Sequence, residues 1–369
     1  MSSVTATSST SDSMSRRTLG IVGVGLIGGS IGMAARRAGW EVSGVDADAT
    51  LERAVELEAI DHPAGLDSVR GAEMVVLAAP VSRIPGLLAE LAPTDALVTD
   101  VGSAKAAIVR AAAAAGIGRF VGGHPMAGSQ LGGVANASAD LFQGARYLIT
   151  PTGDTLPEAY ARVTQFVRDD LGAVPTAVDP ERHDRLVAAL SHLPHLLAVA
   201  LLEVTSGISP DALSFAGPSF RDLTRVGAAN PTLWADILAE NAGAIHEVIG
   251  SFSEAMRRLG GDIDDRPATE RRFTQAGAAY QTLGGFLIEQ TGHNVDVAVP
   301  IENRPRVLAQ VTTLMGSNDI NILDLYMQHS DTHHAALVLT IDAVSVDRAL
   351  GLLRGAGFHA EPLATGQAD

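Results

Sequence analysis

The sequence contains no cysteine, and it has a single lysine, Lys105, beside 25 arginines. Without cysteine the chain forms neither disulfides nor thiolate zinc sites. Its histidines are scattered without the close spacing of metal ligands, so we predict no metal site. Positive charge is also scarce: 26 basic residues stand against 42 acidic ones, a net charge of -16. This balance argues against a nucleic-acid partner.

Long apolar runs are missing as well. No uninterrupted run approaches the roughly 18 residues that span a bilayer, so we expect no membrane partner. Residues 2–13 are mostly Ser and Thr without the apolar core of a signal peptide, and we predict a disordered tail over residues 1–17. A soluble cytoplasmic protein is expected. The chain of 369 residues, 46% of them hydrophobic, is long enough for two or three domains with real cores.

The most informative stretch is TLGIVGVGLIGGS, residues 18–30, which carries G-x-G-x-x-G as Gly23, Gly25 and Gly28. Gly23 allows a tight turn, Gly25 lets a pyrophosphate approach the backbone, and Gly28 lets helix and strand pack closely. Asp46 follows Gly25 by 21 residues and can accept hydrogen bonds from an adenosine ribose. A glycine-rich turn that binds nothing is the alternative interpretation.

The residues around this motif complete a dinucleotide-binding unit. Leu19–Val22 is an apolar run typical of a buried parallel strand, and a second strand, EVSGVD, ends at Asp46. A helix ended by Gly39 lies between them, and Leu26 and Ile27 stand at its start, where free N–H groups bind phosphates. The sequence therefore predicts NAD or a similar dinucleotide at this loop.

Three segments follow from the hydrophobic pattern. Residues 18–177 alternate strands and helices, with further strands at 74–80, 96–103, 119–125 and 145–150, which predicts a Rossmann-type doubly wound parallel sheet, an α/β fold. Residues 178–290 have helical spacing and form an all-α domain, predicted to bind substrate and to dimerise. Residues 293–369 read β-α-β-β-α-β, a small α+β ferredoxin-like module that is either a structural appendage or a ligand sensor.

Ligands of such sheets bind beyond the carboxyl ends of the strands. Pro80, Ser103 and His124 stand there. A neutral His124 imidazole near a nicotinamide is suited to accept the proton of an alcohol, and a hydroxyl beside it can orient the ring. Ser103 is equally explained as a helix N-cap, and His124 as a structural loop residue. Lys105 either touches cofactor or substrate or lies solvated in the first turn of a helix.

The helical segment offers two further candidate groups. His192 and His195 lie in S-H-L-P-H; without a third ligand nearby we discount a metal, and expect one ring to face the cleft and the other to be buried. Arg221 and Arg225 stand four residues apart and can share a helix face as a clamp for carboxylates. A surface ion pair with Asp222 is the alternative.

Five motifs in order, GVGLIGGS, DVGSAK, GGHPMAGS, SHLPH and FRDLTR, resemble the prephenate dehydrogenase (TyrA-type) family of tyrosine biosynthesis over residues 18–260. The segment after residue 293 resembles the amino-acid-sensing ACT domain. The resemblance implies a homodimeric NAD-dependent dehydrogenase that oxidatively decarboxylates prephenate to 4-hydroxyphenylpyruvate, with an amino-acid effector at the C-terminal domain. A related arogenate dehydrogenase and a non-catalytic regulator that binds NAD and an amino acid are the alternatives.

The same resemblance assigns residue roles. His124 would accept the hydrogen of the ring hydroxyl, Ser103 would hydrogen-bond His124 and reach the nicotinamide, and Arg225 would bind the ring carboxylate. His192 and Arg221 would shape the substrate pocket. Gln130 stands where family members often carry Glu, which favours prephenate over the ammonium-bearing arogenate. Arg306 replaces the glycine usual after the proline of the first ACT loop, which argues against tyrosine sensing there.

Overall fold

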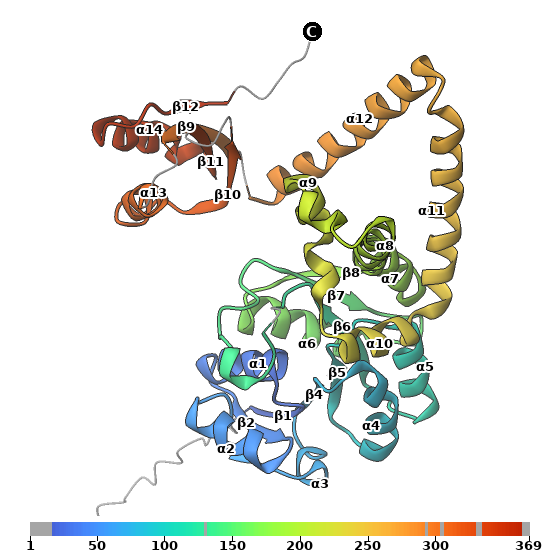
Figure 1. Ribbon diagram of the computed structural model, residues 1–369. Helices are drawn as coiled ribbons and strands as arrows, with labels where there is room; N and C mark the ends of the chain where they lie inside the picture. The colour runs from blue at the N-terminus through green and yellow to red at the C-terminus, as the bar shows by residue number, and fades with distance from the viewer. Residues whose placement is uncertain (1–16, 129–130, 292–293, 303–305, 330–333, 364–369) are drawn as a thin grey trace, which may run out of the picture. The chain divides into compact units, whose positions relative to one another are not determined.

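The computed structural model of the chain describes residues 17–128, 131–291, 294–302, 306–329 and 334–363 (Figure 1). Gln130 and residues 1–16 of the predicted tail lie outside these ranges. The chain divides into two compact units, residues 1–256 and 257–369. The finer boundaries predicted at 177/178 and at 290/293 stay predictions.

An eight-stranded sheet with the order β3-β2-β1-β4-β5-β6-β7-β8 forms the centre of the first unit. Its strands are β1 (Thr18–Val22), β2 (Glu41–Val45), β3 (His62–Pro63), β4 (Met74–Leu77), β5 (Leu97–Asp100), β6 (Phe120–Pro125), β7 (Arg146–Thr150) and β8 (Val174–Ala177). All neighbours are parallel except β6 and β7. The doubly wound sheet is therefore confirmed with one antiparallel step. The chain between β6 and β7 contains no α-helix among its described residues, and an antiparallel neighbour needs no crossover helix.

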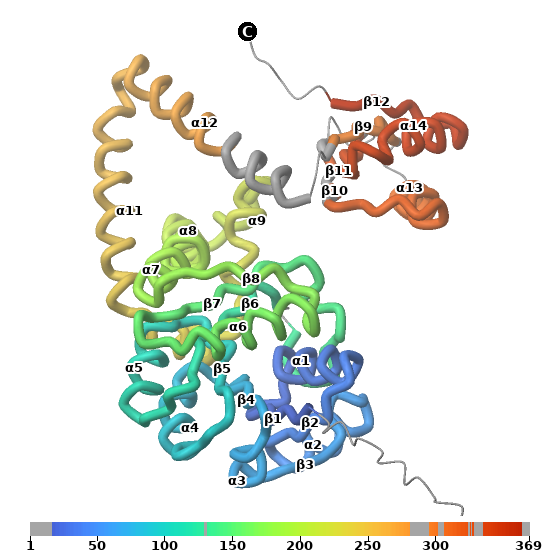
Figure 2. Tube along the Cα trace, turned by 180° about the vertical axis from the view of Figure 1, so that it is seen from behind, coloured from blue at the N-terminus to red at the C-terminus, as the bar shows by residue number. Residues whose placement is uncertain are grey.

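Both faces of this sheet are covered by helices (Figures 1 and 2). On β4, Met74 and Val76 join one core while Val75 and Leu77 join the other, because successive side chains of a strand point to opposite faces. The helices of the first face are α1 (Leu26–Arg37), α2 (Asp48–Glu56) and α6 (Pro157–Gln165), the last continued by η3 (Phe166–Asp170). Those of the second are α3 (Leu66–Val69), α4 (Ile84–Leu91) and α5 (Ala106–Ala114). Burial on both sides explains why these strands are apolar runs.

Helices follow the sheet, as predicted. They are α7 (Pro180–Val187), η4 (Ala188–His192), α8 (Leu193–Ile208), α9 (Pro218–Thr224), η6 (Arg225–Ala228), α10 (Pro231–Glu240) and α11 (Ala242–Asp262). Asp179 caps α7 by accepting the N–H of Arg182 at 3.0 Å. The turns of η4 are of the wide π type just before Pro194, which has no N–H to donate to the helix ladder.

One expectation about long apolar segments needs correction. Within the helical stretch Pro180–Ile208, an 18-residue window has a mean hydropathy of 1.7, and the stretch is long and apolar enough to cross a membrane by length and composition. Only 22% of that apolar window is buried within the structure. Counting uninterrupted runs missed it because His, Ser and Pro residues interrupt the apolar ones.

The second unit contains α12 (Arg266–Thr291) and a four-stranded antiparallel sheet of order β10-β11-β9-β12. The sheet module reads β9 (Asn294–Glu302), α13 (Val307–Gly316), β10 (Ile322–His329), β11 (His334–Asp342), α14 (Val346–Gly355) and β12 (Glu361–Pro362). This element order is the predicted ferredoxin-like one. Arg306, which precedes α13, has a φ of 73° in the left-handed region that favours glycine.

Candidate active site

The glycine loop between β1 and α1 is tight on its protein side and open on the other. Gly23 has a φ of +95°, and a Cβ there would lie 2.6 Å from the Ala78 carbonyl group. A Cβ on Gly28 would lie 1.9 Å from the Gly23 carbonyl oxygen. A Cβ on Gly25 would meet nothing within 4 Å. Gly23 and Gly28 are therefore required for packing, whereas the space over Gly25 is free for a ligand.

The start of α1 completes this phosphate-binding geometry. No side chain caps the helix, so its first N–H groups, in the turn that contains the half-buried Leu26 and Ile27, have no side-chain acceptor. The Asp46 carboxylate lies beside the loop: Oδ2 accepts the N–H of Val24 at 2.7 Å and Oδ1 that of Ala47 at 2.7 Å. Each oxygen keeps lone-pair capacity for a hydroxyl donor. Pro80 follows β4 at an exposed position.

Lys105 is wholly buried, which contradicts both of the roles expected for it. Its ammonium forms an ion pair with the Asp100 carboxylate and donates to the Gly123 carbonyl oxygen at 2.8 Å. Asp100 also accepts the N–H groups of Gly102 at 2.8 Å and of Gly123 at 3.2 Å. Burial lowers the pKa of Lys105, and the Asp100 carboxylate opposes that change. This pair ties the end of β5 to the end of β6, and it holds the neighbouring His124 in place.

His124 belongs to a chain of three side chains. Its Nδ1 lies 2.9 Å from Nε2 of His183, and Nδ1 of His183 lies 2.9 Å from Oδ1 of Asp184. The carboxylate of Asp184 also accepts the N–H groups of Lys105 and Ala106, at 2.7 and 2.9 Å, and so caps α5. The sequence interpretation missed His183 and Asp184, although H-D in the first turns of a capped helix was the available signal.

Burial and neighbouring charge set the protonation of this chain. Burial lowers the pKa of His124 well below 6.5, and the positive charges that His183, Lys105 and His192 can carry lower it further. For Asp184, burial raises the pKa, but hydrogen bonds from His183 and from the backbone of Ala106 and Lys105 outweigh it and leave the pKa lowered. His124 is therefore neutral, and Asp184 is ionised, near pH 7.

Ser103 does not form the hydrogen bond to His124 that was predicted for it. It is half-buried, and no hydrogen bond joins it to His124 in the described part of the chain. Helix α7 brings His183 to Nδ1 of His124 instead, which leaves Nε2 as the ring nitrogen without a partner among the described residues. The hydroxyl of Ser103 therefore does not orient the ring in this structure.

His192, the last residue of η4, is joined to the same cluster. The Nδ2 group of Asn241 lies 3.3 Å from Nδ1 of His192 and donates to the Asp184 carbonyl oxygen at 2.8 Å. Trp234 stacks on His195 at 3.7 Å between ring centroids and meets His192 edge-on at 6.0 Å. Burial lowers the pKa of His192 to about 4. His192, 1% exposed, is the buried member of the pair.

Arg221 on α9 and Arg225 at the start of η6 are both exposed. Neither forms an ion pair within the described ranges, and the alternative pair between Arg225 and Asp222 is not formed. Both guanidinium groups are therefore available to an anion.

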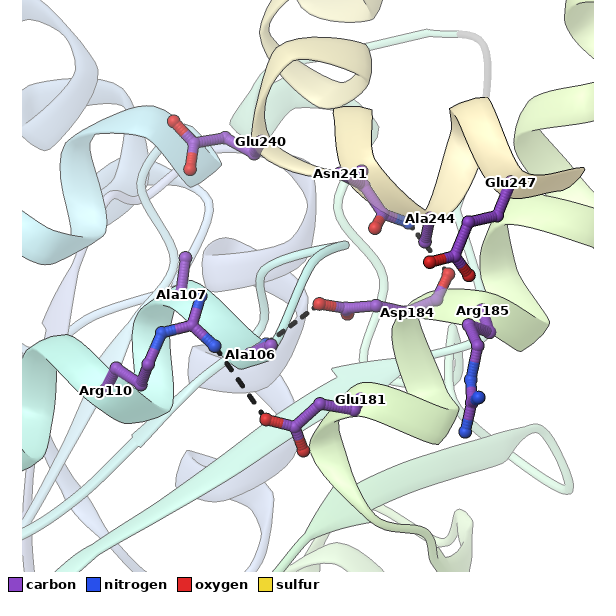
Figure 3. Close-up of a pocket in the computed structure, with 11 residues that line it drawn as sticks. Ala106, Ala107, Arg110, Glu181, Asp184, Arg185, Glu240, Asn241, Ala244 and Glu247 are labelled. Atoms are coloured by element: carbon purple, nitrogen blue, oxygen red, sulfur yellow. Dashed lines mark hydrogen bonds and ion pairs between the residues drawn. The ribbon is translucent and has the colours of Figure 1, made fainter. Parts of the chain in front are cut away.

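A cavity of about 390 Å³ opens beside Asp184 (Figure 3). Figure 3 shows the Asp184 carboxylate turned toward Ala106, while Arg110 and Glu181 form an ion pair at 3.8 Å. Arg185, Asn241 and Glu247 also line the cavity, but none of the predicted catalytic or substrate-binding residues does. Among the described residues no group of three or more His, Asp or Glu side chains could hold a metal ion.

Comparison with known proteins now adds to this geometry. Residues 31–175 match the family described as prephenate dehydrogenase, nucleotide-binding domain, and residues 179–272 match prephenate dehydrogenase, dimerization domain. The first match begins after the glycine loop, so the interpretation of that loop depends on its own geometry.

Curated relatives and solved structures agree. A prephenate dehydrogenase of Bacillus subtilis is 31% identical over 84% of this chain and 87% of its own length. The structure of prephenate dehydrogenase from A. aeolicus in complex with hydroxyphenyl propionate and NAD+ is 31% identical, with a TM-score of 0.68 over 74% of this chain and 99% of that one. Synechocystis arogenate dehydrogenase is 33% identical, with a TM-score of 0.66 over 72% and 99%. The chain belongs to the prephenate dehydrogenase family.

Proposed function

We propose that this chain catalyses the NAD-dependent oxidative decarboxylation of prephenate to 4-hydroxyphenylpyruvate, a step of tyrosine biosynthesis. The observation that carries the proposal is His124, a neutral imidazole fixed at the carboxyl end of the sheet with its Nε2 unpartnered among the described residues. The naming of the B. subtilis relative supports the same reaction.

The residues present fit NAD. The open space over Gly25 and the uncapped start of α1, with Leu26 and Ile27, would receive the pyrophosphate, and the Asp46 carboxylate would bind ribose hydroxyls. Pro80 and Ser103, after β4 and β5, would border the nicotinamide. When bound, NAD supplies the acceptor for the hydride that the substrate loses.

The protein's own part of the reaction is positioning and one proton transfer. Nε2 of His124 accepts the proton of the ring hydroxyl as its carbon becomes a carbonyl. The ring carboxylate leaves as carbon dioxide, its bonding electrons make the ring aromatic, and the former carbonyl oxygen regains the proton from His124 as the hydroxyl of the product. Arg225, with Arg221 nearby, binds a substrate carboxylate, and His192 shapes the pocket. Most of the driving force lies in the aromatisation of the substrate.

Arogenate is the second candidate substrate, and the Synechocystis relative carries that name. Gln130 favours prephenate because it offers no carboxylate for the arogenate ammonium, but this residue lies outside the described ranges. A non-catalytic regulator is the more distant alternative, and an oriented proton acceptor argues against it.

A homodimer and an effector site complete the proposal. The match to a dimerization domain covers α8, where Val204 is 68% and Ile208 is 75% exposed, and apolar surface of this kind is suited to a second subunit. An amino-acid effector at the ACT-like module stays a prediction, as does a cytoplasmic location. Light scattering at micromolar concentration tests the dimer.

The decisive experiment follows NADH absorbance with prephenate and with arogenate, each with NAD and with NADP, in the presence and absence of tyrosine. We expect the highest kcat/KM with prephenate and NAD. A higher kcat/KM with arogenate would replace the substrate, and turnover with neither would overturn the enzymatic function. Comparable efficiency with NADP would contradict the role of Asp46.

A further inference from the structure

We infer that His183 and Asp184 are positioning residues that hold His124 in the tautomer with its proton on Nδ1, so that Nε2 is the free base. The inference rests on the proposed function, in which His124 accepts a proton from the substrate. It concerns residues of α7 that touch His124 or act through it.

The hydrogen-bond chain determines where each proton lies. An ionised Asp184 only accepts, so Nδ1 of His183, 2.9 Å from Oδ1, carries a proton and donates it. In a neutral imidazole the other nitrogen, Nε2, is then a bare acceptor. It lies 2.9 Å from Nδ1 of His124, which must therefore be the donor. With its single proton on Nδ1, His124 presents a bare Nε2.

The ring of His183 is 0% exposed, so its two nitrogens have their hydrogen-bond partners inside the cluster, Asp184 on one side and His124 on the other. The buried ammonium of Lys105 is hydrogen-bonded to the carbonyl of Gly123, the residue before His124, and disfavours a second cation in the cluster. Asp184 already accepts two backbone N–H groups at the start of α5, so its negative charge has partners without a protonated His183.

The reverse arrangement would disable the base. A doubly protonated His183 would donate from Nε2 to Nδ1 of His124, and the single proton of His124 would then lie on the Nε2 that the substrate needs. Asn241 helps to hold His183 and Asp184 in place. Its Nδ2 group donates to the Asp184 carbonyl oxygen and so fixes α7 against the start of α11. The orienting role expected of Ser103 therefore falls to His183.

Two matched substitutions separate positioning from packing. In His183→Asn the amide stands at the level of Nδ1, so it keeps the contact with Asp184 but cannot reach His124. In His183→Gln the amide stands at the level of Nε2, so its oxygen can accept the proton of His124. We expect His183→Asn to lower kcat with prephenate and NAD by at least about 10-fold, because a wrong tautomer removes the proton acceptor. KM for prephenate and Kd for NAD should change by less than about twofold, and His183→Gln should recover most of kcat.

The second measurement is independent of turnover. In the full-length protein labelled with ¹⁵N-histidine, the resonances of His124, assigned by their loss in His124→Ala, should report a proton on Nδ1 in the wild type and lose that preference in His183→Asn. Equal loss of kcat in both His183 variants, or wild-type His124 protonated on Nε2, would overturn the inference. Failure of the wild type to turn over either substrate would instead overturn the proposed function, and the tautomer would still decide this inference.

Discussion

The two groups of residues assigned to the substrate are built in opposite ways. His124 lies in a cluster in which Lys105, Asp100, His183 and Asp184 are almost wholly buried and hydrogen-bonded to one another. Arg225 and its neighbour Arg221 are exposed on short helices, without an ion pair in the described part of the chain. The proton acceptor is thus completed by folding of the first unit alone, whereas the guanidinium groups proposed to bind a carboxylate stand exposed on the surface of that unit.

This difference matches how precisely each group must be positioned before the substrate binds. A general base must be held in one tautomer and orientation before the substrate arrives, and buried hydrogen bonds provide this. A guanidinium group attracts a carboxylate over several angstroms, and the arginine side chain can become ordered when the carboxylate binds. Substitutions in the cluster should therefore affect kcat or stability, and those on α9 and η6 should affect KM.

The largest effect is expected at the proton acceptor itself. His124→Ala should lower kcat by about 10² to 10⁴, the usual contribution of a positioned base, while Kd for NAD stays within about twofold. Stopped-flow or steady-state NADH formation and a fluorescence titration of NAD measure the two. Near-normal turnover would show that His124 is only a structural residue of its loop, and the contrast between the buried cluster and the exposed arginines would then have no catalytic meaning.

The buried ion pair should show the next largest effect, on stability. Lys105→Met leaves the Asp100 carboxylate buried without its cation and should lower the free energy of unfolding by about 3 to 5 kcal/mol in urea titrations. Adding Asp100→Asn should recover part of this loss. Arg110→Met breaks an exposed pair with Glu181 and is the control, expected to change stability by less than about 1 kcal/mol. A Lys105 variant as stable as this control would show that the cluster is not preorganised by the pair.

The exposed group should respond in KM. Arg225→Ala should raise KM for prephenate by about 10²-fold with little change in the melting temperature, because the lost interaction is a charge-assisted one made only with substrate. Arg225→Lys should recover only part, since an ammonium lacks the planar fork of the guanidinium. Asp222→Ala is the matched control and should leave KM unchanged, because no pair with Arg225 forms. An unchanged KM in Arg225→Ala would show that Arg225 does not bind a carboxylate of the substrate.

The effect that is smallest per unit of the variable changed concerns pH. Burial depresses the pKa of His192 from 6.5 to about 4, so the unfolded chain binds a proton between these values that the folded chain does not. Stability is therefore complete above pH 6.5 and decreases as pH falls toward 4, by at most about 1.4 kcal/mol per pH unit for this one group. His192→Gln should show a shallower slope in urea titrations across this range. An identical slope would assign the dependence to other groups, such as His124.

The local parts of the fold were predictable and the long-range ones were not. The G-x-G-x-x-G loop, the strands of the sheet and the β-α-β-β-α-β order have short-range patterns, and the sequence contains them. The contact between His124 and His183 joins residues 59 apart, and no spacing rule predicts it. The prediction for Lys105 was wrong for a related reason. A charged side chain is expected to be exposed unless it has a buried partner, and the sequence does not show that Asp100, at the end of the preceding strand, is that partner.

The burial of Lys105 has a practical consequence for chemical labelling. Since the chain has a single lysine and its ammonium is 0% exposed, an acylating reagent has no accessible side-chain amine on the folded protein. Such reagents therefore leave the single lysine of the folded chain unmodified. Any lysine acylation detected by mass spectrometry would then count the molecules that had opened around the ends of β5 and β6.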